Sequence, residues 1–399
     1  MRSLSDSPTI ARRRFSLTAF LTFVLSLYCI PSSATTLTIA EQKHVFGGEF
    51  VSRCPERTAL GVPVAWSGSG FAMTYYEYGR PGERWGDFLL LLDDDGDPAA
   101  PPIRLTEGRR RSVKILWDGA NYICLIGEIT SLRIKRFSPD GEIESEAEVL
   151  GLLEEVEPVI RAFLVDGVIH TIRESNYNGQ AEWIDLTVEG EQLSEPLQIY
   201  TRGNTESCVY TPHGIAAVSR LYSRITGYIL FLDLFDLTGS RIGFSEEIKG
   251  IHWRPWPALH WNGSHFVSIA GMYMSGEGQV VVTLLFDRWG KRIGDPTSIG
   301  PIPEISGHLS SSELIWTGSE YLAVWNRPCS GDKADIWIRM LDSRGLPTSE
   351  AVKINNEPMD EPRCGTVLTD DGFVIFSVEE GEHSPSISYT RLVADSLSP

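Results

Sequence analysis

The sequence predicts an all-β fold: a seven-bladed β-propeller whose blades are four-stranded antiparallel sheets. Three observations lead to this prediction. A short motif recurs seven times at spacings of 47 to 55 residues, each period carries a second glycine turn, and the two ends of the chain complement each other by one strand. With 399 residues, of which 42% are hydrophobic, the chain can bury a large core, and its composition is not that of a disordered protein.

The repeated motif consists of Trp, a small polar residue, Gly, two variable residues and an aromatic residue. Four clear copies begin at Trp66, Trp117, Trp261 and Trp316. Three weaker copies fill the gaps, at Val165-Asp166-Gly167, Pro212-His213-Gly214 and Asp371-Gly372-Phe373. The glycines of the seven copies are Gly68, Gly119, Gly167, Gly214, Gly263, Gly318 and Gly372. Asp-Gly and Asn-Gly pairs accept the positive φ of a tight hairpin, so each copy predicts a turn between two strands.

A second set of glycines follows the first at a distance of 22 to 28 residues, at Gly96, Gly141, Gly190, Gly239, Gly290 and Gly345. Apolar, β-branched and aromatic runs flank both turns of each period. In the sixth period these runs cover residues 314–316, 321–325, 336–341 and 351–354, which gives four short strands. A helical period is suggested only near residues 152–156.

The two ends of the chain provide an internal check. After Gly372 only 27 residues remain, enough for two strands at 373–378 and 387–393 but not for a fourth strand. Near the other end, residues 36–40 form one spare strand. We therefore expect the N-terminal strand to complete the last blade, which closes the ring and removes two exposed sheet edges.

The first 34 residues predict a signal peptide. Arg12, Arg13 and Arg14 precede an apolar run at 15–30, and Ser32-Ser33-Ala34 offers small residues for cleavage after Ala34. The run of 16 residues is shorter than the ~20 needed for a membrane anchor. The propeller domain then covers residues 35–399.

The export route stays open between two alternatives. Arg12-Arg13-Arg14-Phe15 resembles a twin-arginine signal, but Ser16 stands where Leu is usual, so the general secretory route fits as well. Tyr28 before Cys29 is too large for a lipid-anchor site. The expected location is the periplasm or the cell exterior, with no membrane insertion after cleavage.

The charge of the processed chain limits its partners. Removing residues 1–34 takes away four basic residues and one acidic residue, which leaves 31 basic and 52 acidic residues and a net charge of −21. Such an excess of carboxylates repels polyanions, so nucleic acid and anionic membrane surfaces are poor candidates as partners. A protein, peptide or glycan ligand remains open, and we expect a monomer.

Five cysteines remain after processing: Cys54, Cys124, Cys208, Cys329 and Cys364. They do not form a disulfide framework, and no CxxC pair indicates a metal or redox site. One bridge is compatible with an oxidising compartment. The topology places Cys329 and Cys364 in neighbouring blades on one face, so this pair is the predicted disulfide.

The repeat also resembles a known group of proteins. The Trp-x-Gly-x-x-Tyr/Phe unit, followed by an apolar strand and a turn such as Leu341-Asp342-Ser343-Arg344-Gly345, is similar to repeats of uncharacterised secreted bacterial β-propeller proteins. The resemblance covers nearly the whole processed chain and implies the fold. It implies no catalytic residue, because propellers of this type serve as binding scaffolds, surface proteins and occasionally enzymes. The kelch, WD40 and sialidase signatures do not recur here.

Two clusters invite a metal interpretation, and we expect neither to bind one. Asp93, Asp94, Asp95 and Asp97 surround Gly96, but an EF-hand register would place Leu91 and Pro102 at ligand positions. The alternative, an acidic hairpin turn, fits the repeat. His252, His260 and His265 fall on a loop, a strand and the far side of a turn, so they do not converge. No cofactor motif is present.

No catalytic signature occurs: there is no nucleophile elbow and no phosphate-binding loop. In a propeller, the loops that enter each blade and those between its second and third strands share one face, here called the channel-mouth face. Aromatic and basic residues gather in those loops. The predicted ligand-binding residues are Arg111, Arg173, Tyr222, Trp253, Arg254, Trp256 and Arg327.

The leading functional hypothesis is a secreted, non-catalytic binding or scaffold propeller with its ligand or partner on this face. The alternative is a carbohydrate-active enzyme, a glycoside hydrolase or lyase, that uses carboxylates in the channel mouth. Two acids within about 10 Å beside Trp253 or Trp256 would favour the enzyme. A mouth lined only by arginines and aromatic residues would favour binding.

Overall fold

The protein is described from a computed structural model. The described residues are 37–47, 62–77, 86–107, 112–128, 131–150, 159–174, 180–223, 227–251, 257–274, 278–301, 312–330, 333–360, 362–379 and 386–394. The compact unit discussed below is Thr35–Pro399. Across these described ranges, no helix has the length and apolar character needed to cross a membrane. The predicted signal peptide and residues 152–156 lie outside the described ranges.

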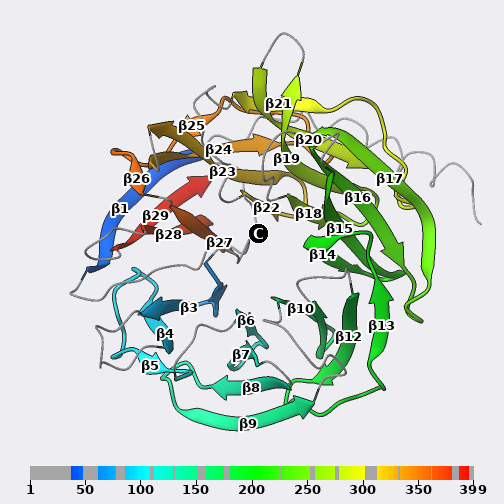
Figure 1. Cartoon of the computed structure of the whole chain (residues 1–399). Helices are drawn as coiled ribbons and strands as arrows, with labels where there is room; N and C mark the ends of the chain where they lie inside the picture. Colours follow the sequence, from blue (N-terminus) through cyan, green and yellow to red (C-terminus); the bar gives the residue numbers. More distant parts are fainter. Residues whose placement is uncertain are drawn as a thin grey trace, which may run out of the picture. The chain divides into compact units, whose positions relative to one another are not determined.

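Seven antiparallel sheets succeed one another around a central axis (Figure 1). The first three blades follow the chain in order. Blade 1 consists of β2 (Val64–Trp66), β3 (Gly70–Glu77), β4 (Gly86–Asp93) and β5 (Ile103–Arg104). Blade 2 consists of β6 (Ser112–Trp117), β7 (Tyr122–Gly127), β8 (Ser131–Phe137) and β9 (Ile143–Leu150). Blade 3 consists of β10 (Val159–Val165), β11 (Val168–Glu174), β12 (Gln180–Thr187) and β13 (Leu197–Tyr200).

The next three blades repeat the same order. Blade 4 consists of β14 (Asn204–Thr211), β15 (Gly214–Ser223), β16 (Gly227–Phe235) and β17 (Arg241–Ile251). Blade 5 consists of β18 (Ala258–Trp261), β19 (Phe266–Met274), β20 (Gly278–Phe286) and β21 (Thr297–Pro301). Blade 6 consists of β22 (Ser312–Trp316), β23 (Tyr321–Ser330), β24 (Lys333–Leu341) and β25 (Val352–Lys353), with β26 (Met359–Asp360) also paired to β24.

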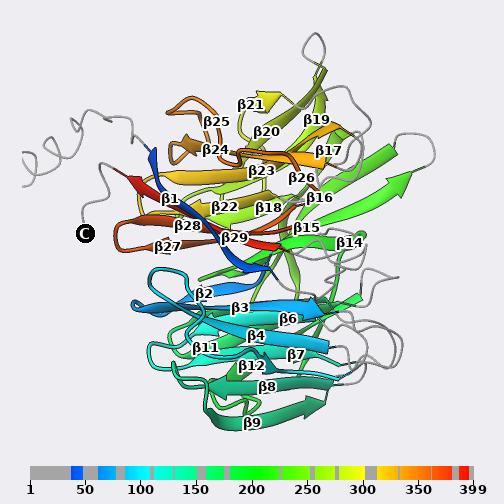
Figure 2. The same cartoon turned by 90° about the vertical axis from the view of Figure 1, so that its left-hand side faces the viewer.

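Blade 7 is assembled from both ends of the chain. Its sheet order is β1-β29-β28-β27, where β27 is Arg363–Thr369, β28 is Gly372–Glu379, β29 is Ser386–Ala394 and β1 is Leu37–Gly47. β1 runs antiparallel to β29, from Leu37 opposite Ala394 to Gly47 opposite Ser386. Figures 1 and 2 show the blue β1 beside the red β29. The predicted closure is confirmed, and the closing strand extends beyond residue 40.

Each pair of neighbouring blades buries its own hydrophobic cluster, and the seventh cluster joins blade 7 to blade 1. The motif aromatics take part in this packing. Trp66 lies 4.4 Å from Phe71 between ring centroids, and Trp316 lies 4.6 Å from Tyr321. The four tryptophans of the repeat are therefore packing residues at the inner edges of blades 1, 2, 5 and 6.

The inner hairpin of every blade closes through two residues, but its glycine does not always occupy the same place. Gly68 is the first turn residue in blade 1, because Ser67 bonds to Gly70 across the turn. In blade 3 the turn is Asp166-Gly167, and both residues have positive φ, 50° and 78°. Gly214 and Gly372 follow the turn and begin the next strand. Among the three weaker sequence copies, the glycine is therefore a turn residue in blade 3 and the first strand residue in blades 4 and 7.

The outer turn glycines have a double role. Gly96, for example, has a φ of 80°, and a Cβ atom there would lie 2.5 Å from Cδ2 of Tyr389 in blade 7. Gly190 of blade 3 similarly packs against Ala147 of blade 2, and Gly345 of blade 6 against Val267 of blade 5. Each of these turns therefore approaches the preceding blade at a distance that a side chain would prevent.

Candidate functional site

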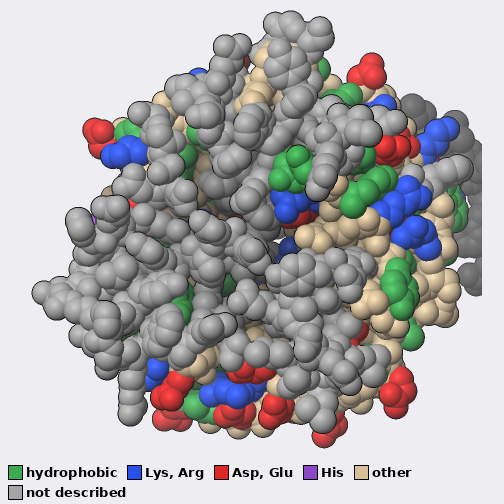
Figure 3. Space-filling model, in the orientation of Figure 1, with side chains coloured by type: hydrophobic (Ala, Val, Ile, Leu, Met, Phe, Trp, Pro, Cys, Tyr) green, Lys and Arg blue, Asp and Glu red, His purple; other side chains and the backbone are tan. Residues whose placement is uncertain are grey.

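The innermost strands enclose a cavity on the propeller axis. Its volume is about 270 Å³, and every blade contributes to its lining. The innermost strands are β2, β6, β10, β14, β18, β22 and β27. In Figure 3, which has the orientation of Figure 1, Lys or Arg side chains are visible at a small hollow near the middle of the molecule.

One strand position supplies most of the polar lining. In blade 1, Trp66 pairs with Phe71 beside the inner turn, and Pro63 lies three residues before it. Leu164, Tyr210 and Leu368 take the place of the tryptophan in blades 3, 4 and 7, because they pair at the same step from the turn. Counting back three residues in every blade gives Pro63, Lys114, Arg161, Ser207, Ala258, Glu313 and Gly365. All but Gly365 line the cavity.

The positive and negative side chains at this position lie on opposite sides of the ring. Lys114 belongs to blade 2 and Arg161 to blade 3, whereas Glu313 belongs to blade 6. In a ring of seven, blades 2 and 3 are the two farthest from blade 6, and Figure 1 shows β22 across the ring from β6 and β10. Blades 1 and 5 offer Pro63 and Ala258, which leave room between the charged walls.

Burial shapes the ionisation of these groups. It lowers the pKa of Lys114, an effect that Glu313 opposes through its charge. Burial also raises the pKa of Glu313 to about 7. The cationic groups of the site therefore face a carboxyl group that exchanges its proton near neutral pH.

Several polar atoms of the site are buried without a protein partner. Among the described residues, none hydrogen-bonds to Nε or Nη1 of Arg161 or to Oε2 of Glu313. The remaining nitrogen of Arg161, Nη2, donates to the carbonyl of Glu206 at 2.8 Å. Buried polar groups are normally satisfied, so these atoms indicate a place for water or a ligand.

A second polar cluster adjoins the cavity at the seam of blades 3 and 4. The buried carboxyl of Glu174 accepts a hydrogen bond from the Thr205 backbone N–H. Burial raises the pKa of Glu174 to about 8, and the charge of Arg161 opposes this rise. Glu206, which lines the cavity, forms a 2.8 Å ion pair with Arg220.

The predicted residue Tyr222 lies on β15 of blade 4, two residues after Arg220. The guanidinium of Arg220 lies 5.1 Å from the ring centroid of Tyr228, and Tyr228 lies 5.1 Å from the ring of Tyr222. Tyr222 is 64% exposed. A continuous series of contacts thus leads from the cavity wall to an exposed aromatic residue.

Two other predicted residues are also described. Arg173 is fully buried and forms a 2.8 Å ion pair with Glu182 of the neighbouring strand. It therefore stabilises the interior of blade 3 and is not presented to a ligand, which corrects the sequence prediction. Arg327 lies 5.2 Å above the ring of Trp337 in blade 6.

Arg111, Trp253, Arg254 and Trp256 lie outside the described residues, so their ligand-binding role remains a prediction. Much of the predicted channel-mouth face, including the loops before β6, β18 and β22, is likewise outside the described ranges.

The structure does not form the predicted disulfide. Cys329 and Cys364 are free thiols. The buried Cys364 directs its thiol to Oδ1 of Asn326 at 3.6 Å, whereas Cys329 directs its thiol to the carbonyl of Lys333 at 3.4 Å within its own hairpin. The two thiols therefore contact different hydrogen-bond acceptors and not each other.

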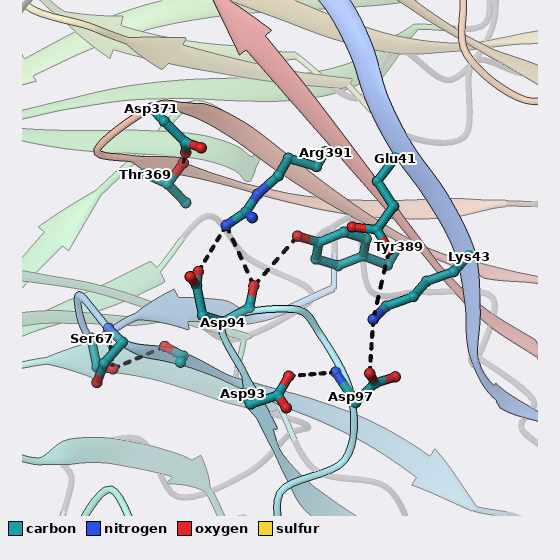
Figure 4. A network of polar contacts seen from close by, with 12 residues as sticks. Glu41, Lys43, Ser67, Asp93, Asp94, Asp97, Thr369, Asp371, Tyr389 and Arg391 are labelled. Carbon is teal, nitrogen blue, oxygen red and sulfur yellow. Dashed lines mark hydrogen bonds and ion pairs between the residues drawn. The ribbon is translucent and has the colours of Figure 1, made fainter.

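The acidic turn after β4 joins two blades. Oδ1 of Asp93 accepts a hydrogen bond from the backbone N–H of Asp97, which closes the turn. Asp94 pairs with Arg391, and Asp97 pairs with Lys43 (Figure 4). No group of His, Cys, Asp and Glu residues in the described part of the chain is arranged to hold a metal ion.

The described histidines of the sequence trio are separated. His260 packs edge-on to Tyr321, with ring centroids 5.5 Å apart, and burial lowers its pKa to about 4. His265 contacts Ser264 in the inner turn. His252 lies outside the described residues.

Sequence reasoning missed Lys114, Arg161 and Glu313. A usable signal was present, because each interrupts an apolar inner strand at the same distance from its turn. Aligning the blades on the turn, rather than on the glycine, would have placed these charges in one ring.

Comparison with known proteins shows the fold and does not assign a function. No family model and no curated protein matches this chain. The WD40 domain of Toxoplasma gondii coronin is 12% identical, with 90% of this chain and 86% of that chain covered and a TM-score of 0.57. Polysaccharide lyase Uly1 is 10% identical, covering 89% and 99%, with a TM-score of 0.51. The Dos1 propeller is 12% identical, covering 88% and 95%, with a TM-score of 0.50.

Proposed function

We propose that this protein is an exported, non-catalytic binding propeller that takes up a small polar ligand in its axial cavity. One observation carries the proposal: Lys114, Arg161 and Glu313 converge on the cavity from three blades, with buried atoms that lack protein partners. Burying such groups is unfavourable unless they are paired. A bound ligand would supply the missing partners.

The size of the cavity restricts the ligand. Its volume of about 270 Å³ lies just below the ~300–1,000 Å³ of common ligand pockets. A compact molecule or the end of a longer chain is therefore a better candidate than a folded partner. Side chains of both signs indicate a ligand that is charged or rich in hydrogen-bonding groups.

A thermal-shift screen of residues 35–399 tests the proposal. The panel comprises free amino acids and dipeptides, muropeptides, neutral oligosaccharides and uronic-acid oligosaccharides. We expect at least one class to raise the unfolding temperature of the wild type. We expect Lys114→Met to abolish that rise and the exposed control Lys291→Met to retain it. A panel without any binder, or a rise that survives Lys114→Met, would refute the axial site.

A carbohydrate-active enzyme is the second candidate. It is favoured by two carboxylates in one cavity, Glu206 and Glu313, and by the pKa of about 7 for Glu313, which suits a general acid. A protein of similar fold is described as a polysaccharide lyase. Uronic-acid oligosaccharides incubated with the wild type and with Glu313→Gln distinguish the candidates. Turnover that depends on Glu313 would establish the enzyme.

Export is proposed from residues 1–34. The motivation is the basic, apolar and small-residue sequence described above. Expression of the full chain with N-terminal sequencing of the secreted product tests it. We expect the product to begin at Thr35; retention of the intact N-terminus inside the cell would contradict export.

A further inference from the structure

The polarity of the cavity suggests the chemical class of its ligand. We infer that the site binds a small zwitterion, a free amino acid or a short peptide, with its carboxylate toward Lys114 and Arg161 and its ammonium toward Glu313. This inference rests on the proposed function and goes beyond it, because the binding proposal alone requires no particular charge on the ligand.

The carboxylate side is formed by neighbouring blades. Lys114 and Arg161 occupy equivalent positions on β6 and β10, so both cationic groups reach the same half of the cavity. Arg161 is only 8% exposed, and its Nε and Nη1 lack partners among the described residues. A buried guanidinium whose Nε and Nη1 lack a partner can donate charge-assisted hydrogen bonds to a carboxylate.

The ammonium side lies across the axis. Glu313 lines the opposite wall, and its Oε2 has no hydrogen-bond partner in the described part of the chain. No described residue forms an ion pair with Glu313, although the charge of Lys114 acts on it across the cavity. Thr366 of blade 7 lines the cavity beside Glu313, and hydrogen bonding from Thr366 lowers the pKa of this carboxyl group against the larger effect of burial. These groups match the three N–H donors of an ammonium.

Lys114 and Arg161 lie on one wall of the cavity and Glu313 on the opposite wall, which favours a ligand that contacts both walls. The cations and the carboxyl group attract one another but do not meet in an ion pair, because they are anchored to opposite sides of the ring. A zwitterion can place its carboxylate beside the cations and its ammonium beside Glu313 at the same time. A purely anionic ligand would instead place a negative charge near Glu313, and a purely cationic ligand would face Lys114 and Arg161.

The test uses residues 35–399 and chemically blocked ligands. The twenty free amino acids and L-alanyl-L-alanine are screened by thermal shift, and the strongest binder is then measured by calorimetry in free, N-acetylated and C-amidated forms. Acetylation removes the positive charge, and amidation removes the negative charge. We expect each blocked form to bind about tenfold or more weakly than the free form.

Two variants separate the two ends of the ligand. Glu313→Gln should weaken the free form about tenfold and leave the N-acetylated form unchanged. Lys114→Met should weaken the free form and leave the amidated form unchanged. Glu350→Gln, exposed on the same blade as Glu313, and Lys291→Met serve as controls and should bind like the wild type.

The outcomes distinguish this inference from the proposed function. Equal binding of the N-acetylated and free forms would overturn the zwitterion while leaving an anion-binding propeller. Binding of an oligosaccharide but of no amino acid or dipeptide would also overturn the zwitterion, while leaving the proposed binding propeller in place. Absence of any binder in both screens would overturn the inference and the proposed function together. If Lys114→Met fails to fold, the blocked ligands and Glu313→Gln still decide the question.

Discussion

Nη2 of Arg391 donates a 2.7 Å hydrogen bond to Oδ1 of Asp94, and this contact ties the last blade to the first. Lys43 of the closing strand adds a 3.1 Å ion pair with Asp97 of the same turn (Figure 4). Tyr389, between them, packs on Gly96. The N-terminal strand thus completes blade 7 and also contacts blade 1, so the closure of the ring involves two interfaces.

Removal of residues 37–47 should destabilise the whole ring. The deletion exposes β29 as a sheet edge and removes the Lys43 contact with Asp97. We expect a loss of roughly 3 kcal/mol or more in the free energy of unfolding, measured by denaturant titration.

A synthetic peptide of residues 36–47 should restore part of that stability when added in trans, because the register of β1 on β29 specifies its pairing. A scrambled peptide is the control. Unchanged stability after the deletion, or equal rescue by the scrambled peptide, would contradict the closing role of β1.

Gly96→Ala should be much more damaging than Gly68→Ala. Both residues have positive φ, 80° and 92°, so both substitutions strain the backbone by about 1 kcal/mol. Only at Gly96 would the new Cβ overlap a neighbour, at 2.5 Å from Tyr389, whereas Gly68 has no atom within 4 Å. Thermal unfolding should show a cost of about 3 kcal/mol at Gly96 and about 1 kcal/mol at Gly68. Equal costs would mean that the turn does not press on blade 7.

Glu174→Gln should change the pH dependence of stability. Folding raises the pKa of Glu174 from 4.5 to about 8, chiefly by burial, so the folded state retains a proton that the unfolded state releases. The contribution of Glu174 is therefore fully present below pH 4.5 and is lost as the pH rises toward 8.

The glutamine variant keeps an acceptor for the Thr205 N–H and does not ionise. We expect it to match the wild type near pH 4.5 and to exceed it by about 2 kcal/mol at pH 8 in urea titrations. Glu191→Gln, on the exposed outer turn of the same blade, should follow the wild-type curve. Parallel curves for wild type and Glu174→Gln would show that this carboxyl group does not carry the effect.

The double variant Lys114→Met/Glu313→Gln should be at least as stable as the wild type without ligand. Both groups lose hydration in the cavity, and neither forms an ion pair with a residue of the described ranges, so neutral replacements remove an unfavourable contribution to the folding free energy. An increase of about 1 kcal/mol in unfolding free energy, with loss of ligand-induced stabilisation, would mark the pair as kept for binding. A loss of several kcal/mol would instead make it a structural pair.

The sequence alone determined the architecture, because the relevant signals are local. Glycine turns such as Asp166-Gly167 accept positive φ, and the spacing of the repeated glycines therefore counts the blades. The short C-terminal period and the spare strand near residue 40 predicted the closure for the same reason. The acidic residues 93–97 were correctly assigned to a turn.

The tertiary structure alone decided which charges meet. Lys114 and Glu313 are about two hundred positions apart and converge because seven blades complete a circle. Arg173 looked like a channel-mouth residue in the sequence, yet cross-strand pairing buries it against Glu182. β11, which carries Arg173, is buried along almost its whole length, so its sequence has no polar alternation that shows which side chains reach the surface. Only the packing of the assembled ring decides that.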